Sequence, residues 1–184
     1  MIIEGLCTTV DSAGVLNVAP MGPVVDEQLA SFLFRPFKTS TTFANLKSQG
    51  CGVFHVTDDV ELIARAALSS IHDVDTAPAE VVQGCVLRNC CRWYEFEITS
   101  IDESSDRTEM TTRVVHQGRQ RDFFGFNRAK HAVLELTILA TRLHLLPKEK
   151  ILEEADRLRV AVEKTAGESE FRAFEFVENY IRQH

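Results

Sequence analysis

The chain has 184 residues and a formal net charge of −7, with 45% hydrophobic and 26% charged residues. This is a globular composition, and its acidic balance argues against a nucleic-acid or anionic-membrane binder, because either requires a basic face. No apolar run approaches the ~20 residues that cross a bilayer, and the N-terminus lacks the pattern of a signal peptide.

The cysteines favour a reducing compartment. They are odd in number and form no C-x-x-C pair, which argues against a disulfide framework or a structural zinc site. The five are Cys7, Cys51, Cys85, Cys90 and Cys91. We therefore expect reduced thiols and a cytoplasmic protein.

The N-terminal residues predict a β-hairpin. Two strand-like runs, Met1–Val10 and Val15–Ala19, flank a turn composition at Asp11–Gly14. Pro20–Pro23 then excludes an ordinary central strand, because proline lacks an N–H group and glycine allows close backbone approach. We expect a bulged edge against which a flat molecule could lie. A loop without a ligand is the alternative that these residues leave open.

A strand, a short helix and a second strand follow. Gln28–Phe34 and Cys51–Val56 are apolar enough for strands, and Thr41–Ser48 can form about two helical turns. Ser40 or Thr41 is the expected N-cap of that helix, and Gly50 lies just past its end.

The next segment predicts a helix and then a loop. Asp58 and Glu61 have capping-box spacing, with Asp58 as the cap of a helix that continues to Leu68. Ser69–Glu80 has the composition of a loop. A metal site at His72, Asp73 and Asp75 is conceivable there, but a solvated loop is the favoured interpretation.

Three further runs complete a predicted barrel. Val81–Leu87, Cys91–Ile101 and Thr108–His116 are strand-like, with a hairpin turn at Asp102–Arg107. About six strands with turn residues between them predict a small antiparallel barrel.

The C-terminal third predicts helices. Asn127 can cap the first, which Pro147 ends, and Glu149–Thr165 and Glu168–Arg182 are amphipathic. We therefore predict an α+β, mainly β fold with a barrel domain over residues 1–119 and a helical domain over residues 120–184.

The turn before the first helix is the candidate binding site. Arg35 and Lys38 supply two positive charges, and four hydroxyls follow at Thr39, Ser40, Thr41 and Thr42. A helix start favours anions, because its first N–H groups are unpaired and its dipole is positive there. A bound phosphate is one interpretation, and simple capping and turn chemistry is the other.

Other chemistries lack their motifs. The chain has no Walker loop, no G-x-G-x-x-G fingerprint and no G-x-S-x-G elbow. The six histidines lack the spacing of paired metal ligands. We therefore predict no metal site and identify no catalytic residue.

Two stretches together carry a family resemblance. Asn17–Pro23 and Phe34–Leu46, followed by the strand Val53–Thr57, resemble the FMN-binding split-barrel superfamily, which includes flavin reductases, flavoredoxins and pyridoxamine-phosphate-oxidase-like proteins. More closely, the Arg-Pro-Phe-Lys-Thr-Ser-x-Thr turn at Arg35–Thr42 and the helix start at Phe126–Lys130 are similar to the DUF447 family. This resemblance covers nearly the whole chain.

The resemblance implies a split barrel that binds FMN as a homodimer, with two FMN molecules near the interface. It places Asn17–Gly22 against the ring and Arg35–Thr42 around the phosphate, with Asn45 nearby. Residues of the helical domain could complete the site. Trp93 or Tyr94 could stack near the ring, although strand aromatics more often form core. The implied cofactor-binding residues are Asn17, Ala19, Pro20, Met21, Gly22, Arg35, Phe37, Lys38, Thr39, Ser40, Thr41, Thr42, Asn45, Asn127 and Arg128.

Three functions remain open on the sequence. The first is an FMN-dependent oxidoreductase that takes hydride from a nicotinamide or another reductant. The second is a flavin-binding module without turnover, acting as a carrier, store or sensor. The third is a dimeric barrel whose hydroxyl-rich turn only caps a helix.

Overall fold

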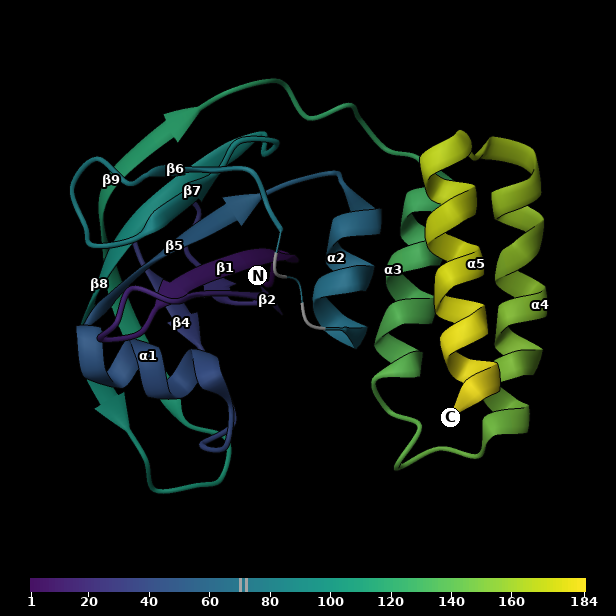
Figure 1. Ribbon diagram of the computed structural model, residues 1–184, viewed down its shortest axis with the longest axis horizontal. Coiled ribbons are helices and arrows are strands. Elements are labelled where there is room, and N and C mark those ends of the chain that lie inside the picture. The colour runs from purple at the N-terminus through teal and green to yellow at the C-terminus, as the bar shows by residue number, and fades with distance from the viewer. Residues whose placement is uncertain (70, 72) are drawn as a thin grey trace. The chain divides into compact units, whose positions relative to one another are not determined.

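A curved antiparallel sheet forms most of the N-terminal part of the protein (Figure 1). The computed structural model describes residues 1–69, 71 and 73–184, and within these residues seven strands form one sheet in the order β2-β1-β5-β8-β9-β4-β3. Their bounds are β1 (Gly5–Val10), β2 (Leu16–Met21), β3 (Val24–Val25), β4 (Phe32–Phe34), β5 (Cys51–Val56), β8 (Arg92–Asp102) and β9 (Glu109–Arg119). The sheet is a half-barrel of the predicted mainly β, α+β class.

The two ends of the sheet approach each other at the N-terminus. Ile2 forms an isolated bridge with Val24, and the Val25 N–H group donates to the Met1 carbonyl at 2.8 Å. The curled sheet encloses an aromatic core in which ring centroids lie 4.8–6.4 Å apart. Such pairs each contribute about 0.5–1.5 kcal/mol beyond the area that they bury. The rings belong to Phe32, Phe34, Phe54, Tyr94 and Phe96.

The β1–β2 hairpin is confirmed, and its register corrects one expectation. Pairing is continuous from Val10 opposite Leu16 to Gly5 opposite Met21, so no bulge interrupts the strand at Pro20. Proline is accommodated because β2 is an edge strand, where a missing N–H group need not break a ladder. The predicted edge is therefore present, and the predicted bulge is wrong.

Two other strand predictions need correction. Residues 28–31 belong to a turn, because the Asp26 carboxylate accepts the N–H groups of Gln28, Ala30 and Ser31. Within the predicted loop Ser69–Glu80, β6 (Thr76–Pro78) pairs with β7 (Cys85–Leu87) as a separate two-stranded sheet. The strand predicted from Val81 therefore begins only at Cys85.

A buried carboxylate shapes the residues that precede β7. The carboxylate of Glu95 on β8 accepts the N–H groups of Glu80, Val81 and Val82 at 2.7–2.9 Å, although the residue is 0% exposed. Burial alone would raise the pKa of Glu95, but these hydrogen bonds outweigh it and hold the pKa below its ordinary value. A charged side chain therefore serves here as a structural anchor.

Two short helices connect the strands. α1 (Thr41–Gln49) contacts β1, β2 and β5, and Gly50 ends it in the left-handed conformation with φ 72°. Asp59 caps α2 (Val60–Leu68) by accepting the Leu62 N–H group. The predicted cap, Asp58, instead accepts the Phe124 N–H group through its carboxylate.

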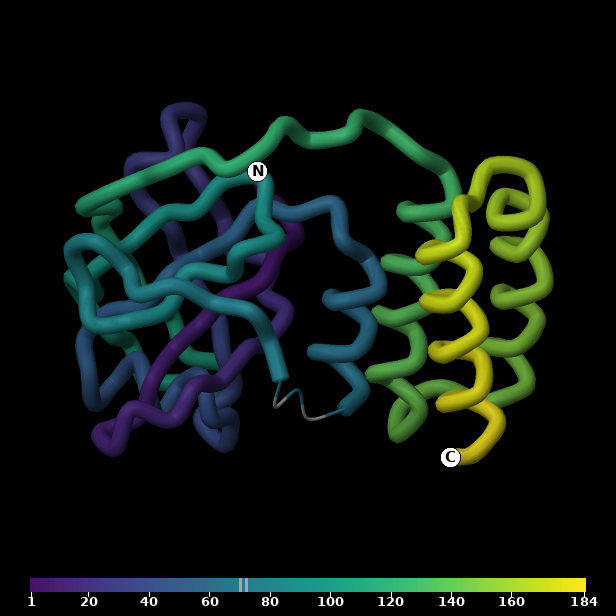
Figure 2. Tube along the Cα trace, turned by 45° about the horizontal axis from the view of Figure 1, so that its top comes forward, coloured from purple at the N-terminus to yellow at the C-terminus, as the bar shows by residue number. Residues whose placement is uncertain are grey.

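Three long helices follow the sheet, as expected: α3 (Arg128–Ala140), α4 (Lys148–Thr165) and α5 (Glu168–Gln183). Both ribbon and trace show them side by side with α2 (Figure 2). Their small and branched apolar side chains form a second core with Val60 and Ala64 of α2. Lys130 ties this group together, since its ammonium contacts the Asp58 carbonyl at 2.6 Å and the Glu170 carboxylate at 3.1 Å.

The chain forms two compact units, Met1–Thr57 with Ile71–Phe123, and Asp58–Ser70 with Phe124–His184. We expected a single boundary near residue 120, with residues 58–70 in the barrel. Whether 1–119 and 120–184 are separate domains stays a prediction, and in the structure α2 packs within the helical unit.

Within the described residues, no helix is long and apolar enough to cross a bilayer. No group of three His, Cys, Asp or Glu side chains in the same residues could hold a metal ion, and His72 lies outside them. The cytoplasmic location stays a prediction.

A buried histidine predicts a pH-dependent stability. His55 is 0% exposed, and the Leu87 N–H group donates to its Nε2, so Nδ1 carries the proton and donates to the Leu6 carbonyl. Burial lowers the pKa of His55 from 6.5 to about 4, with the Leu6 carbonyl opposing the shift.

Between these two pKa values the unfolded chain binds more protons, so the free energy of unfolding rises with pH. We expect His55 alone to remove about 3 kcal/mol as the pH falls from above 6.5 to 4. Urea unfolding at several pH values measures this slope. His55→Gln should flatten it, and an unchanged slope in that variant would contradict the assignment.

Candidate functional site

Four polar side chains connect β1, β2 and α1, and we call them the Thr9 cluster: Thr9, Asn17, Thr42 and Asn45. The Thr9 hydroxyl accepts the Asn17 amide at 3.2 Å and the Asn45 amide at 3.1 Å. The Asn17 amide also donates to the Thr42 hydroxyl at 3.1 Å. The two stretches that the sequence singles out, Asn17–Gly22 and Arg35–Thr42, therefore meet at Asn17 and Thr42.

The Thr9 cluster is largely buried. Thr9 is 1% exposed, Thr42 3% and Asn45 5%, whereas Asn17 is half-buried. Buried amide and hydroxyl groups are expensive to leave unpaired, so each fixes the position of the next. Thr42 and Asn45 therefore act as a frame for the start of α1, and their side chains are engaged within the protein.

The start of α1 leaves several N–H groups for a ligand. Ser40 is the N-cap, because its hydroxyl accepts the Phe43 N–H group and donates to the Phe37 carbonyl. Among the described residues, no protein acceptor contacts the N–H groups of Thr39, Thr41 and Thr42. These donors and the positive end of the helix dipole suit an anion.

The cations around this turn differ in availability. Arg35 forms an ion pair with Glu109 at 2.9 Å, so its charge is already partly compensated. Lys38 is exposed, and among the described residues no carboxylate lies within ion-pair distance of it. Its positive charge still acts on Asp102 in the β8–β9 turn. Asp102 there has a lowered pKa, first because Ser104 donates to it and to a smaller extent because of Lys38.

A further cation beside this turn, Arg107, was not among the residues predicted from the sequence. Arg107 donates to the Arg35 carbonyl at 3.1 Å, and its guanidinium lies 5.6 Å from the centre of the Phe37 ring, which is 58% exposed. Sheet pairing brings it there, since Phe37 and Arg107 form an isolated bridge. A separation of seventy positions in the chain gives no local pattern that could have identified Arg107.

The predicted ring-binding segment lies on the open edge of the sheet. Within the part of the chain that the structure describes, β2 pairs only with β1, so the other row of its backbone groups is available for hydrogen bonds. Ala19, Pro20 and Met21 are half-buried, and Gly22 is exposed. Asn17 and Met21 are about 13 Å apart along an extended strand. The segment is therefore an open strand edge of that length, and it starts at the Thr9 cluster.

The remaining predicted residues belong to other surroundings. Asn127 caps α3 by accepting the N–H groups of Ala129 and Lys130, and Arg128 is exposed. Both lie in the helical unit, so their part in a site with residues of the barrel stays a prediction. Tyr94 belongs to the aromatic core, and the Trp93 indole donates to Glu95 at 3.3 Å.

Family comparisons match both parts of the chain. The model described as "Protein of unknown function (DUF447) N-terminal domain" matches residues 3–121, and the one described as "Protein of unknown function (DUF447)" matches residues 127–179. No curated protein matches the sequence.

Solved structures share the fold. An FMN-bound protein of Methanosarcina mazei, also assigned to DUF447, is 25% identical with a TM-score of 0.83 over 97% of this chain and 94% of that one. Two others show likeness of fold alone. They are the Pseudomonas fluorescens 2-nitrobenzoate 2-nitroreductase (16% identity, TM-score 0.55, 63% of this chain and 64% of that one) and the Desulfovibrio vulgaris flavoredoxin (12%, 0.54, 64% and 69%).

The Thr9 cluster yields a stability prediction. Thr9→Val removes the acceptor of the Asn45 amide, and leaving a buried donor unpaired should lower the free energy of unfolding by about 1–3 kcal/mol. Thr9→Ser keeps the hydroxyl and should lose clearly less. Urea unfolding of the two variants beside the wild type measures the difference. A larger loss in Thr9→Ser than in Thr9→Val would show that the methyl group, and not the hydroxyl, matters.

Proposed function

Because this chain belongs to the DUF447 family, in which the Methanosarcina mazei protein is FMN-bound, we propose that it binds FMN. The start of α1 holds the phosphate, and the flavin ring lies against the open edge of β2. The observation that supports this most strongly is the 3.1 Å hydrogen bond from the Asn17 amide to the Thr42 hydroxyl. It joins the expected ring segment and the expected phosphate segment into one surface.

The donors at the helix start fit a phosphate dianion. The N–H groups of Thr39, Thr41 and Thr42 have no protein acceptor among the described residues, and the exposed Lys38 supplies a positive charge. The hydroxyls of Thr39 and Thr41 are on exposed residues, so they can turn toward a ligand. Charge-assisted hydrogen bonds of this kind are about twice as strong as neutral ones.

In the proposal, some predicted site residues position the turn and others contact the phosphate. Ser40, Thr42 and Asn45 use their side chains within the protein, so in the proposal they position the turn. Lys38, Thr39 and Thr41 contact the phosphate. Arg35 keeps its ion pair with Glu109 and adds to the local positive potential, as Arg107 does.

We propose that the protein is a flavin-dependent oxidoreductase of unknown substrate. FMN, when bound, supplies the hydride and electron chemistry, and the protein supplies binding and orientation. The alternative is a flavin-binding module that does not turn over. A nicotinamide or another reductant is the proposed electron donor.

We also propose a homodimer, as the family resemblance implies. Exposed apolar side chains near the proposed site are compatible with a partner surface, since Val15 is 62% exposed and Phe37 58%. Light scattering of the purified protein measures the mass directly, and a monomer at micromolar concentration would rule this part out.

The phosphate assignment predicts a selective loss of affinity. Lys38→Ala should weaken FMN binding by roughly tenfold and leave riboflavin binding nearly unchanged, because only FMN carries the phosphate. Calorimetric titration of both flavins measures this. Lys47→Ala is the matched control, because Lys47 lies in the last turn of the same helix, paired with Glu103.

The two flavins and the two lysine variants distinguish phosphate binding from a general effect of charge. Equal weakening of FMN and riboflavin in Lys38→Ala would contradict the phosphate assignment but leave flavin binding in place. Equal weakening of FMN in Lys38→Ala and Lys47→Ala would show that only net charge matters.

The redox proposal has its own test. The FMN-loaded protein should show the flavin band near ~450 nm, and NADH or NADPH without oxygen should bleach it if a nicotinamide is the donor. Dithionite is the positive control for reduction. Bleaching by dithionite alone over many hours would favour the module or another electron donor.

A further inference from the structure

A cavity lies on the barrel unit away from the Arg35–Thr42 turn. Its volume is about 320 Å³, which is at the lower end of the usual range for small-molecule sites. It lies between the turn that precedes β4 and the second half of β9, whereas the Arg35–Thr42 turn follows β4 and meets the start of β9. Its lining residues are Gln28, Leu29, Ala30, Val114, Val115, His116 and Gln117.

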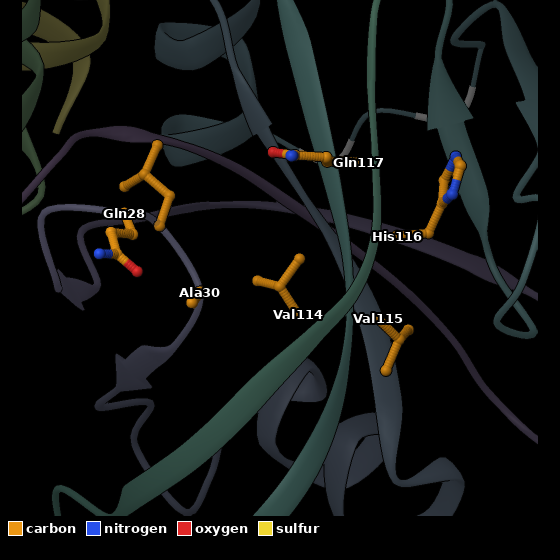
Figure 3. Close-up of a pocket in the computed structure, with 7 residues that line it drawn as sticks. Gln28, Ala30, Val114, Val115, His116 and Gln117 are labelled. Atoms are coloured by element: carbon orange, nitrogen blue, oxygen red, sulfur yellow. The ribbon is translucent and has the colours of Figure 1, made fainter.

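A β-bulge decides which side chains face this cavity. Val114 pairs with Phe96 and His116 with Glu95, although Phe96 and Glu95 are adjacent on β8, so Val115 is the extra residue. The bulge places Val114 and Gln117 on the side of β9 that faces Gln28 and Ala30, and Val115 and His116 on the other side (Figure 3). Bulges commonly re-aim side chains in this way beside functional sites.

The opposite wall is held rigidly. The Asp26 carboxylate accepts the N–H groups of Gln28, Ala30 and Ser31, and the Ala30 carbonyl accepts the Val114 N–H group at 2.9 Å. Leu29 adopts the left-handed conformation with φ 54°, which an ordinary side chain enters only when its surroundings enforce it. The cavity is therefore already formed before any ligand arrives.

The cavity offers amide groups and no charge. Its lining contains no Asp, Glu, Lys or Arg, and the His116 ring points away, toward the Glu80 carboxylate at 3.4 Å. Gln28 and Gln117 contribute side-chain amides. Beyond Val114, β9 pairs only with β8 among the described residues, so the other edge of residues 115–119 presents free backbone amides.

We propose that this cavity binds a small, uncharged organic molecule with an apolar body and a carboxamide or similar amide edge. Leu29, Ala30 and Val114 contact the apolar body. The side-chain amides of Gln28 and Gln117, with the open edge of β9, pair with the amide edge. A charged group finds no oppositely charged side chain among the lining residues, so the cavity favours the uncharged molecule.

Benzamide and benzoate are matched probes, because they share a shape and differ in charge. Amide NMR spectra of ¹⁵N-labelled protein should show saturable shifts at residues 28–30 and 114–117 with benzamide. The expected dissociation constant is on the order of millimolar, as for a small fragment. Benzoate should bind at least ~tenfold more weakly. The titration needs no FMN, so its result is independent of the proposed cofactor.

Two variants and a control localise the binding. Ala30→Trp fills the cavity from an exposed position whose backbone contacts stay intact, and it should abolish the benzamide shifts. Gln117→Leu removes one amide and should weaken benzamide several-fold. Thr111→Leu, at an exposed position of β9 outside the cavity, should change nothing.

Three results would overturn the proposal. The first is equal binding of benzamide and benzoate, which would mean that charge plays no part. The second is an unchanged benzamide titration in Ala30→Trp, which would place binding elsewhere. The third is a change of oligomeric mass in Ala30→Trp with no benzamide shifts in the wild type, which would show that a second copy of the chain covers this edge.

Discussion

The buried hydroxyl of Thr9 is the constraint on which the proposed site depends. It accepts hydrogen bonds from two asparagines, one on the edge strand β2 and one in α1, while the residue itself lies on β1, between β2 and β5. Because Asn45 is buried and Asn17 is half-buried, these hydrogen bonds hold the strand and the helix in one relative position. The start of α1 is thereby fixed, with Lys38, beside the open edge of β2. The N–H groups there have no protein acceptor among the described residues. A rigid frame of this kind suits a ligand with a phosphate at one end and a flat ring at the other.

Much of the fold follows from local pattern. The hairpin around Asp11–Gly14, the buried strand Cys51–Val56, the Ser40 cap and the Asn127 cap all depend on residues close in sequence, and they are present in the structure. The predictions that failed involve competition between neighbours. Asp58 and Asp59 both suit a helix cap, and the Phe124 N–H group, sixty-six positions away, engages Asp58. Likewise, Asp26 gathers three N–H groups into a turn where apolar content alone predicts a strand.

The parts of the site that pattern could not reveal are those made by the sheet. Thr9 is one of two threonines in a fully buried strand, and only its partners distinguish it from Thr8, whose hydroxyl donates to the Cys85 carbonyl. Arg107 reaches the Arg35–Thr42 turn through strand pairing. The alternating pattern of β8 places Glu95 on the outward face of the strand. It is nevertheless fully buried, with three backbone N–H groups around its carboxylate. Long-range hydrogen bonds, and not residue type, determine these roles.

The central claim is that the start of α1 holds the FMN phosphate as a dianion. Phosphorus NMR of the FMN-loaded protein tests it, because the phosphate shift reports protonation. A free phosphate monoester takes up its proton near pH ~6. Our account predicts a midpoint clearly below that of free FMN, since the N–H groups and Lys38 stabilise the dianion. A bound flavin whose phosphate titrates like that of free FMN would contradict the account.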